Sequence, residues 1–362
     1  MAAKTTTQST LPASYRLELQ TPLVLLMTTK HMGNLLVALH CMQEIVKASA
    51  GQSLVVIDER YRDIIDATSG IGKVLYYPRQ QLKTTGLRAK AKLLYDFYRQ
   101  LRQHQARLLL DFDGQGQAST ITQLSGINQR IGPIDALRSK GLYSLQLADI
   151  ERPPHRFNDY ALYLTTFLGH NPRPQYPRLD TSPANDDNLA AILHEYQFEH
   201  CMPLVCIHVG ATKAYKQWPI EHYAEIADWL AEQGQQVVFI GAGAADTQRV
   251  SRVQALCQRP HVNVCEQLSL RLLIALFQQC RFFLGNDSGP MHLAAAAGAR
   301  VYAIFGPTHE DRWGPLGNKA TVIRNSQACE SSCSKKLCPV NHRCMNTLDP
   351  AQVKAVLQQH LL

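Results

Sequence analysis

The chain has 362 residues, of which 45% are hydrophobic and 18% charged, and its formal net charge is +8 with a pI near 9.0. At roughly 150 residues per domain, this length predicts two domains, and the composition excludes a largely disordered protein. The sequence has no signal-peptide pattern and no apolar stretch of about 18 residues, so we expect a cytosolic protein. The positive charge either serves solubility or favours acidic partners, and we find no nucleic-acid-binding motif.

Short apolar runs alternate with amphipathic stretches in the first half of the chain. Helical spacing over residues 35–48 predicts a helix after the first run. The predicted strands lie at 22–27, 53–58, 73–78 and 106–113. Such strands separated by helices are typical of parallel βαβ units. We therefore expect a Rossmann-like domain over residues 21–180, preceded by a flexible segment, 1–20.

Proline, asparagine and aspartate are concentrated in the middle of the chain. The segments ERPPHRF (151–157) and HNPRPQYPRLDTSPANDD (170–187) are too rich in these residues to predict a helix or a central strand. We interpret the second segment as the linker between the domains.

A second set of alternating units follows this linker. The predicted strands lie at 202–210, 235–243, 261–268, 282–287 and 300–307, and the predicted helices at 220–232, 270–280 and 291–297. They predict a second Rossmann-like domain over 181–345, followed by a closing helix within 346–362 that Asp349 caps and Pro350 begins. The fold class is thus α/β, with two Rossmann-like domains facing a central cleft lined by strand carboxyl ends.

The segment LGNDSGPMHLAAAAGARVYAIFGPT (284–308) is the most informative for function. A strand ends here in a tight turn of Asp287, Ser288 and Gly289, which opens onto a helix that carries His292 one turn later. Free N–H groups and the helix dipole suit such a start to phosphate oxygens. The alternative is that Asp287 and Ser288 only cap the helix.

A second strand, loop and helix form HVGATKAYKQWPIEHYAEIADWL (208–230). Its loop contains Thr212, Lys213 and Lys216, whose hydroxyl and ammonium groups are suited to holding a diphosphate without a metal ion. The alternative interpretation is that the lysines are solvated side chains near a helix start.

Together these segments, with LLLDFDGQGQASTITQLSGINQRIG (108–132), resemble glycosyltransferase family 9, the ADP-heptose:lipopolysaccharide heptosyltransferases. The resemblance of 108–132 is to a strand, a small-residue helix and an Arg-Ile-Gly turn. The resemblance implies a GT-B fold, a nucleotide-sugar in the C-terminal domain, an acceptor in the N-terminal domain and no cofactor. It implies donor-binding roles for Thr212, Lys213, Lys216, Gly241, Gly243, Asp246, Asp287, Ser288, Gly289 and His292.

The first strand is followed by a departure from the family pattern. The family shows Gly-Asp, with the aspartate as the proposed base, whereas this sequence has Gly33 and Asn34. An amide cannot accept a proton, so Asn34 is left to orient the acceptor beside Gly33. The base is then His31, or a carboxylate after another strand, Asp111 or Asp113.

Four of the ten cysteines, with His342 among them, lie near the C-terminus in CESSCSKKLCPVNHRC. Cys329, Cys333, Cys338 and Cys344 are spaced irregularly for a zinc ribbon. We consider three alternatives: a structural iron or zinc site, a redox-sensitive pair, or reduced thiols in a loop.

The resemblance implies inverting transfer of heptose from ADP-L-glycero-D-manno-heptose to the inner core of lipopolysaccharide. Lys216, Thr212 and the helix start would stabilise the departing ADP. The acceptor would be a lipid A-linked core glycolipid, met peripherally at the cytoplasmic face of the inner membrane. The alternatives are another donor or acceptor, or a non-catalytic nucleotide-sugar-binding protein, which Asn34 favours.

Overall fold

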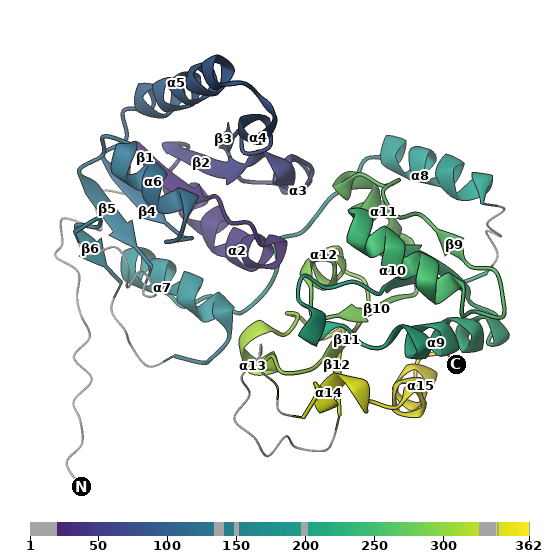
Figure 1. Ribbon diagram of the computed structural model, residues 1–362. Helices are drawn as coiled ribbons and strands as arrows, with labels where there is room; N and C mark the ends of the chain where they lie inside the picture. The colour runs from purple at the N-terminus through teal and green to yellow at the C-terminus, as the bar shows by residue number, and fades with distance from the viewer. Residues whose placement is uncertain are drawn as a thin grey trace, which may run out of the picture. The chain divides into compact units, whose positions relative to one another are not determined.

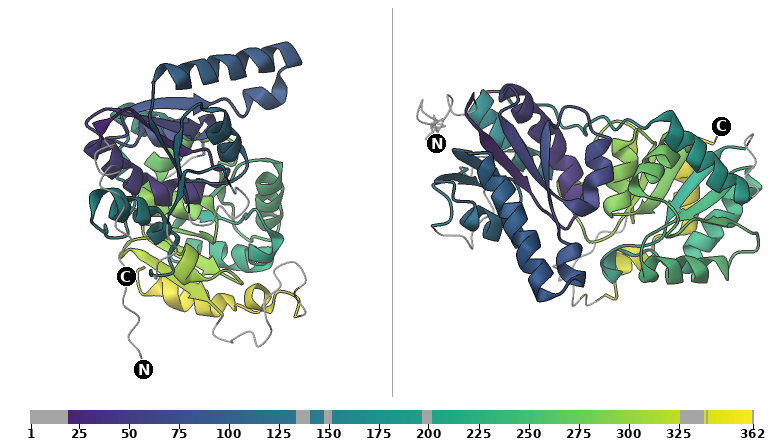
Figure 2. Two further views of the ribbon diagram at one scale, coloured as in Figure 1. Left: turned by 90° about the vertical axis from the view of Figure 1, so that its left-hand side faces the viewer. Right: turned by 90° about the horizontal axis from the view of Figure 1, so that it is seen from above.

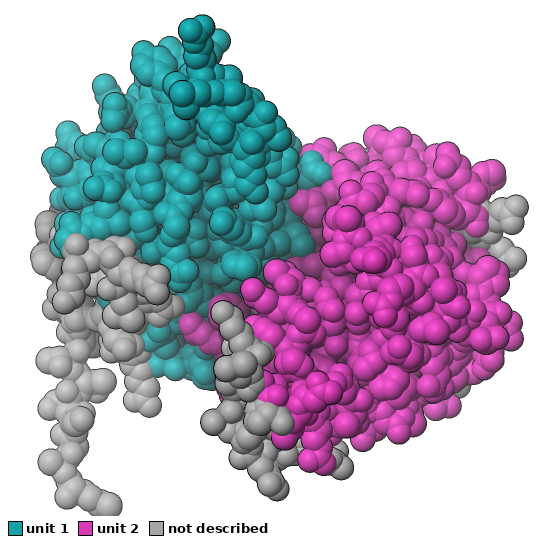
Figure 3. All heavy atoms as spheres, in the orientation of Figure 1, with its two compact units in different colours: residues 1–177 teal, residues 178–362 magenta. Residues whose placement is uncertain are grey.

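The computed structural model describes residues 20–133, 141–147, 152–196, 202–325, 338 and 340–361. The predicted N-terminal segment therefore lies, up to residue 19, outside the described residues. The chain divides into two compact units, Met1–Pro177 and Arg178–Leu362, which are coloured separately in Figure 3. Each unit contains one six-stranded parallel sheet with helices packed on it (Figure 1).

The sheet of the first unit has the order β3-β2-β1-β4-β5-β6. Its strands are β1 (Leu23–Met27), β2 (Ser53–Asp58), β3 (Lys73–Tyr77), β4 (Leu108–Asp111), β5 (Gln129–Gly132) and β6 (Leu145–Gln146). Its helices are α2 (Met32–Ala48), α3 (Arg62–Asp66), α4 (Gln81–Thr84), α5 (Leu87–Gln103), α6 (Gln117–Leu124) and α7 (Arg156–Leu168), with a 3₁₀ turn at Glu59–Tyr61. Every residue of β1, β2 and β4 is buried, as expected for parallel strands that are covered on both faces.

The sheet of the second unit has the order β12-β11-β10-β7-β8-β9. Its strands are β7 (Leu204–His208), β8 (Gln236–Ile240), β9 (Val262–Asn263), β10 (Phe282–Asn286), β11 (Val301–Phe305) and β12 (Ala320–Arg324). Its helices are α8 (Pro183–Glu195), α9 (Ile220–Glu232), α10 (Ala244–Gln254), α11 (Leu270–Gln279), α12 (Gly289–Ala296), α13 (Glu310–Trp313), α14 (Arg343–Asn346) and α15 (Pro350–Gln358), with a 3₁₀ turn at Ala214–Lys216.

The two units share one topology, which decides where polar residues gather. In each sheet the first strand is central, the next two lie on one side of it, and the fourth lies on the other side. The strand order therefore reverses between β1 and β4 in the first unit and between β7 and β10 in the second. Figure 2 gives two further views of the helices packed on these sheets. Loops diverge at such switch points, which leaves room for a ligand beyond the carboxyl ends of the two strands.

The strand and helix predictions are largely confirmed, with shifts at the ends. The helix predicted at 35–48 begins at Met32, and the helix predicted at 291–297 begins at Gly289. The strand predicted at 261–268 has only two residues, Val262 and Asn263. The closing helix begins at Pro350 as predicted, and the Asp349 carboxylate accepts the Ala351 N–H at 2.8 Å.

The boundary between the units, after Pro177, falls inside the predicted linker 170–187. The prediction that neither proline-rich segment contains a helix was wrong at the C-terminal end of each segment. Helix α7 begins at Arg156, where the His155 ring caps it, and α8 begins at Pro183 after Ser182. Proline starts a helix well because its fixed φ is helical and the first turn needs no N–H from it. The Arg-Ile-Gly segment of 108–132 is also corrected, because it lies in strand β5 rather than in a turn.

Candidate functional site

Asn286 ties the two site loops of the second unit together. It is fully buried at the end of β10, and its side-chain amide donates to the carbonyl oxygens of Val209 and Gly210, each at 3.1 Å. Its Oδ1 accepts the backbone N–H of Trp218 at 3.1 Å. One side chain thus satisfies both ends of the loop after β7, and it holds that loop against β10. The sequence analysis did not select Asn286.

Lys216 and Asp287 form the polar centre of this switch point. Lys216 Nζ lies 2.6 Å from Asp287 Oδ2, and the side chains are 23% and 7% exposed. The pair joins residues 208–216 to residues 285–292, as the donor hypothesis requires. Thr212 and Lys213 lie in the same loop, and both are exposed.

The start of α12 lies beside this pair. Ser288 is the N-cap residue and has an extended backbone, but its side chain makes no capping hydrogen bond, and Gly289 and Pro290 open the helix. His292, one turn later, is buried. Because the Ser288 hydroxyl does not cap the first turn, the N–H groups there remain suited to an anion.

The Ser288 hydroxyl contacts a buried histidine instead. Ser288 Oγ lies 3.3 Å from His208 Nδ1, and His208 Nε2 lies 3.2 Å from Asp246 Oδ2. Asp246 also accepts the Ala242 N–H at 3.1 Å. Burial alone would raise the pKa of Asp246, but the hydrogen bond and charge of His208 outweigh it and lower that pKa. Hydrogen bonds therefore connect Asp246, His208 and Ser288 in a chain that runs from α10 to the start of α12.

Two glycines make room for the Asp246 carboxylate. A Cβ atom on Gly210 would collide with Asp246 Oδ1, and one on Gly241 would lie 2.7 Å from Asp246 Cβ. Gly243 has φ of +84° where it caps α10, a conformation that side chains disfavour. The sequence prediction grouped Gly241 and Asp246, and the structure does bring them together.

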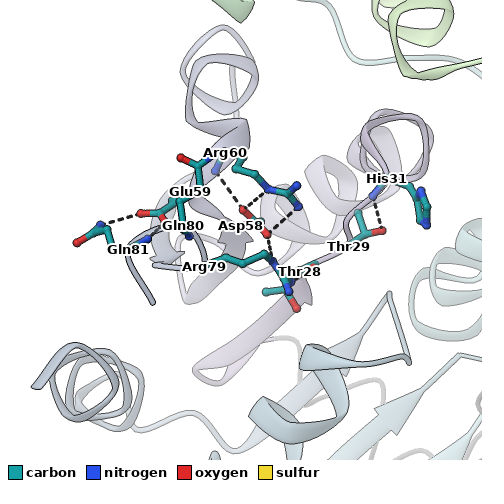
Figure 4. A network of polar contacts seen from close by, with 9 residues as sticks. All are labelled: Thr28, Thr29, His31, Asp58, Glu59, Arg60, Arg79, Gln80 and Gln81. Atoms are coloured by element: carbon teal, nitrogen blue, oxygen red, sulfur yellow. Dashed lines mark hydrogen bonds and ion pairs between the residues drawn. The ribbon is translucent and has the colours of Figure 1, made fainter. Parts of the chain in front are cut away.

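The switch region of the first unit begins with a buried ion-pair network (Figure 4). Asp58, at the end of β2, pairs with Arg79, whose Nη2 donates to the Thr28 carbonyl at 2.6 Å. Arg60 adds a second pair to Asp58 through Nε at 3.0 Å and Nη2 at 3.1 Å. This network, which the sequence analysis did not find, fixes the end of β1 to β2 and to the segment after β3.

Asp111 at the end of β4 is a structural residue. It is fully buried and accepts four hydrogen bonds, from the N–H groups of Asp113 and Gly114 and from the hydroxyls of Thr122 and Tyr143, at 3.0, 2.9, 3.1 and 2.7 Å. Burial raises the pKa of Asp111, although these hydrogen bonds oppose the change. With its lone pairs occupied, this carboxylate holds the loop after β4 and is not available to a substrate.

Asp113 lies two residues further along, beside the loop after β1. The register pairs Leu26 with Asp111, and the Phe112 N–H donates to the Leu26 carbonyl at 2.9 Å, so the chain after β4 stays beside β1 as far as Phe112. Asp113 is half-buried. Burial and then the charge of Asp111 raise the pKa of Asp113 to about 7, against Arg156, Arg79 and the Thr29 hydroxyl, which lower it.

His31, Gly33 and Asn34 form the start of α2, directly after this loop. His31 is the exposed N-cap residue, its side chain does not cap the helix, and its N–H donates to Thr29 Oγ1 at 3.2 Å. Its ring points away from the Asp58 network in Figure 4. Gly33 and Asn34 are partly exposed. The Thr29 side chain thus contacts both the backbone N–H of His31 and the carboxylate of Asp113.

The cysteine cluster is described only in part. Cys329 and Cys333 lie outside the described residues, whereas Cys338 and Cys344 are half-buried free thiols. The His342 N–H donates to Cys338 Sγ at 3.2 Å, just before α14. In the parts of the chain that the structure describes, no helix combines the length and apolar character needed to cross a bilayer.

Known proteins resemble this chain in sequence and in fold. The model of glycosyltransferase family 9 (heptosyltransferase) matches residues 94–343, more than half of the chain. Lipopolysaccharide heptosyltransferase 2 of Salmonella typhimurium strain LT2 is 37% identical over 154 residues, which are 41% of this chain and 43% of that protein. The match thus spans less than half the length of this curated relative.

Two solved structures share the fold over nearly the whole chain. A family 9 glycosyl transferase from Veillonella parvula DSM 2008 has a TM-score of 0.76 and 17% identity, and the match covers 94% of this chain and 96% of that one. The E. coli heptosyltransferase WaaC with ADP has a TM-score of 0.70 and 20% identity, with 93% and 99% covered. These likenesses confirm the two-domain GT-B fold.

Proposed function

The chain belongs to glycosyltransferase family 9 (heptosyltransferase), and we propose that it transfers a heptose from ADP-L-glycero-D-manno-heptose to the inner core of lipopolysaccharide. The observation that carries this proposal is the contact between Lys216 and Asp287 at the start of α12. It puts an ammonium group beside a helix start whose cap residue bonds elsewhere, which suits a diphosphate.

The donor half of the proposal concerns the second unit. Lys216, Thr212 and the N–H groups at Ser288 and Gly289 would bind the two phosphates, with Asp287 holding Lys216 in position. Lys213 and His292 would lie at the edge of the same site, and Asp246, beside Gly241, would contact the ribose. The name of the Salmonella relative and the ADP bound to WaaC support this choice of donor.

The acceptor half concerns the first unit, where a base is needed. We assign that role to Asp113, because Asp58 is ion-paired, Asp111 is fully hydrogen-bonded and Asn34 is an amide. A half-buried carboxylate whose pKa is close to the working pH is well suited to accept a proton. Asn34 and Gly33 would orient the acceptor, and His31 is the second candidate for the base.

The reaction would proceed as a single displacement with inversion. Asp113 takes the proton of the acceptor hydroxyl, and the oxygen attacks the anomeric carbon of the heptose. The bond from that carbon to the diphosphate oxygen breaks, and ADP leaves with the electron pair. Lys216 and the start of α12 would stabilise the negative charge that grows on ADP, which in enzymes of this kind is often the largest contribution.

The acceptor class sets the proposed location. A lipid A-linked core glycolipid is part of a membrane, so the enzyme would meet it peripherally at the cytoplasmic face of the inner membrane. The formal charge of +8 supports contact with an anionic surface.

The test is incubation of the purified protein with ADP-heptose and a truncated core glycolipid, followed by mass spectrometry. We expect the acceptor mass to increase by one heptose, and Asp287→Ala to abolish the increase. If no increase occurs while ADP still binds, a screen of other nucleotide-sugars follows. Transfer from one of these indicates a different donor, and no transfer from any of them indicates the non-catalytic binding protein that Asn34 favours.

A further inference from the structure

Helices α2 and α5 of the first unit have the same length but very different surroundings. Each has 17 residues, yet α2 buries nine of them, whereas α5 buries only Phe97 and Leu101. These two side chains join the core of β1, β2 and β3, and the Phe97 ring packs edge-on against Tyr77 with 5.3 Å between centroids. Helix α5 lies on the periphery of its unit, in blue at the top of Figure 1. Most of its surface is therefore left for solvent or a partner.

The outer face of α5 carries a row of four cations with one tyrosine among them. Arg88, Lys92, Tyr95, Arg99 and Arg102 are all exposed, and their spacing of four, three, four and three residues places them on one side of the helix. The acidic residue of this helix, Asp96, reaches Arg99 only at 3.9 Å. An exposed pair at that distance leaves nearly all of the Arg99 charge directed at solvent.

Large apolar side chains lie exposed among these cations. Leu87 is 85% exposed and Tyr95 69%, and Leu124 at the end of α6 is 47% exposed. An open hollow of about 580 Å³ lies between α5 and the end of α6, with Leu94, Tyr98 and Leu124 in its walls. Arg102, which donates to the Leu124 carbonyl at 3.1 Å, forms part of its rim. Apolar groups that stay in water at a basic surface indicate a binding surface.

We propose that this α5 surface, formed by Leu87, Arg88, Lys92, Tyr95, Arg99, Arg102 and Leu124, docks the protein on an anionic lipid bilayer. The cations match lipid phosphates in charge, and the leucines and Tyr95 suit the boundary between headgroups and acyl chains. Tyrosine is favoured at that boundary, since one end of its ring is apolar and the other polar. This proposal depends on the proposed function in one respect only, namely that the acceptor is a membrane lipid.

The experiment is co-sedimentation of the full chain with vesicles. We expect binding to vesicles of phosphatidylglycerol and phosphatidylcholine, little binding to pure phosphatidylcholine, and a decrease as salt rises. The double variant Lys92→Glu with Arg99→Glu should weaken binding at least tenfold. Tyr95→Ala should lower the binding that persists at high salt, because it removes apolar area rather than charge.

The matched control reverses two exposed arginines of the second unit, Arg252→Glu with Arg259→Glu, and so changes net charge equally. It should bind vesicles as the wild type does. The proposal is overturned if the wild type does not bind anionic vesicles, or if both double variants lose binding equally. Equally tight, α5-dependent binding to duplex DNA would also overturn it, since the surface would then select polyanions in general.

Transfer to a lipid-free core sugar separates this inference from the proposed function. The α5 double variant should keep the wild-type rate on that soluble acceptor, because the changed residues lie outside the site, while losing rate on acceptor embedded in vesicles. A wild type that transfers to neither acceptor refutes the proposed function, and its vesicle binding still tests the α5 surface. Circular dichroism and ADP binding confirm that each variant is folded.

Discussion

The two switch points have the same topology but opposite chemistry. At the ends of β2 and β4, the carboxylate of Asp58 is ion-paired with Arg79 and Arg60, and that of Asp111 is occupied by hydrogen bonds. Beyond β7 and β10, the buried Asn286 is neutral, and the charged pair of Lys216 and Asp287 lies at a helix start. Topology therefore decides where polar side chains meet, whereas the residues at the strand ends decide which charged groups that edge presents.

The comparison also shows which groups the described contacts occupy in each unit. In the first unit Asp58 is ion-paired and Asp111 accepts four hydrogen bonds, whereas burial and the charge of Asp111 raise the pKa of Asp113 to about 7. In the second unit Ser288 turns to His208 rather than to its own helix, so the first turn of α12 stays open. The following changes would break or sharpen this contrast.

The largest expected effect is from Asp113→Asn in the first unit. Loss of the base should lower kcat by roughly 10²–10⁴-fold with little change in ADP affinity. Because the base must be deprotonated, wild-type turnover should rise with pH through about 7, and the variant should lose that rise. The pH–rate profile of both proteins is the measurement. His31→Ala is the comparison, and a loss as large as that of Asp113→Asn would move the role to His31.

Asp58→Ala should affect folding rather than chemistry. It leaves the buried Arg79 without its carboxylate, and breaking a buried pair in this way typically costs about 3–5 kcal/mol. Urea denaturation measures the change. Arg178→Ala is the control, since its pair with Asp180 is exposed and should contribute at most about 0.5 kcal/mol. Equal losses in both variants would mean that the Asp58 network does not hold the first unit together.

In the second unit, Lys216→Ala should lower kcat/KM for the donor by about 10²–10³-fold, the usual cost of one donor to the developing charge. Lys213 lies in the same loop but is exposed, so Lys213→Ala should lower kcat/KM only a few-fold. Steady-state kinetics with ADP-heptose measures both. Similar losses would indicate that the loop acts through its overall charge.

The smallest effect is expected from Asp246→Asn. It should weaken donor binding less than tenfold, because Asp246 would contact only the ribose. Because the pKa of Asp246 is lower in the folded protein, its carboxylate stabilises the fold fully at a pH above the ordinary aspartate pKa of about 3.9. This contribution is lost as the pH falls through the pKa of Asp246 in the folded protein. The stability difference from wild type should therefore be present at neutral pH and disappear in acid. Urea midpoints across pH test the sign.

Local patterns predicted much of this molecule, and contacts between distant residues explain the rest. The strand, loop and helix around Lys216 and around Asp287 follow from periodicity and small residues. The Asp58–Arg79 pair joins residues 21 apart across two strands, and no sequence spacing marks it. The sequence analysis missed Asn286 because an asparagine at the end of a strand is typical of a turn, and its burial cannot be seen in the sequence. The segments around Arg156 and Pro183 were misjudged because proline was treated as a breaker where it starts or precedes a helix.

The grip of the second unit on a sugar diphosphate is tested most directly by calorimetric titration of ADP in the presence of EDTA. The account predicts saturable binding of one ADP per chain, weakened at least tenfold by Lys216→Ala and little changed by Lys213→Ala. No binding by the wild type, or an unchanged affinity in Lys216→Ala, would contradict it.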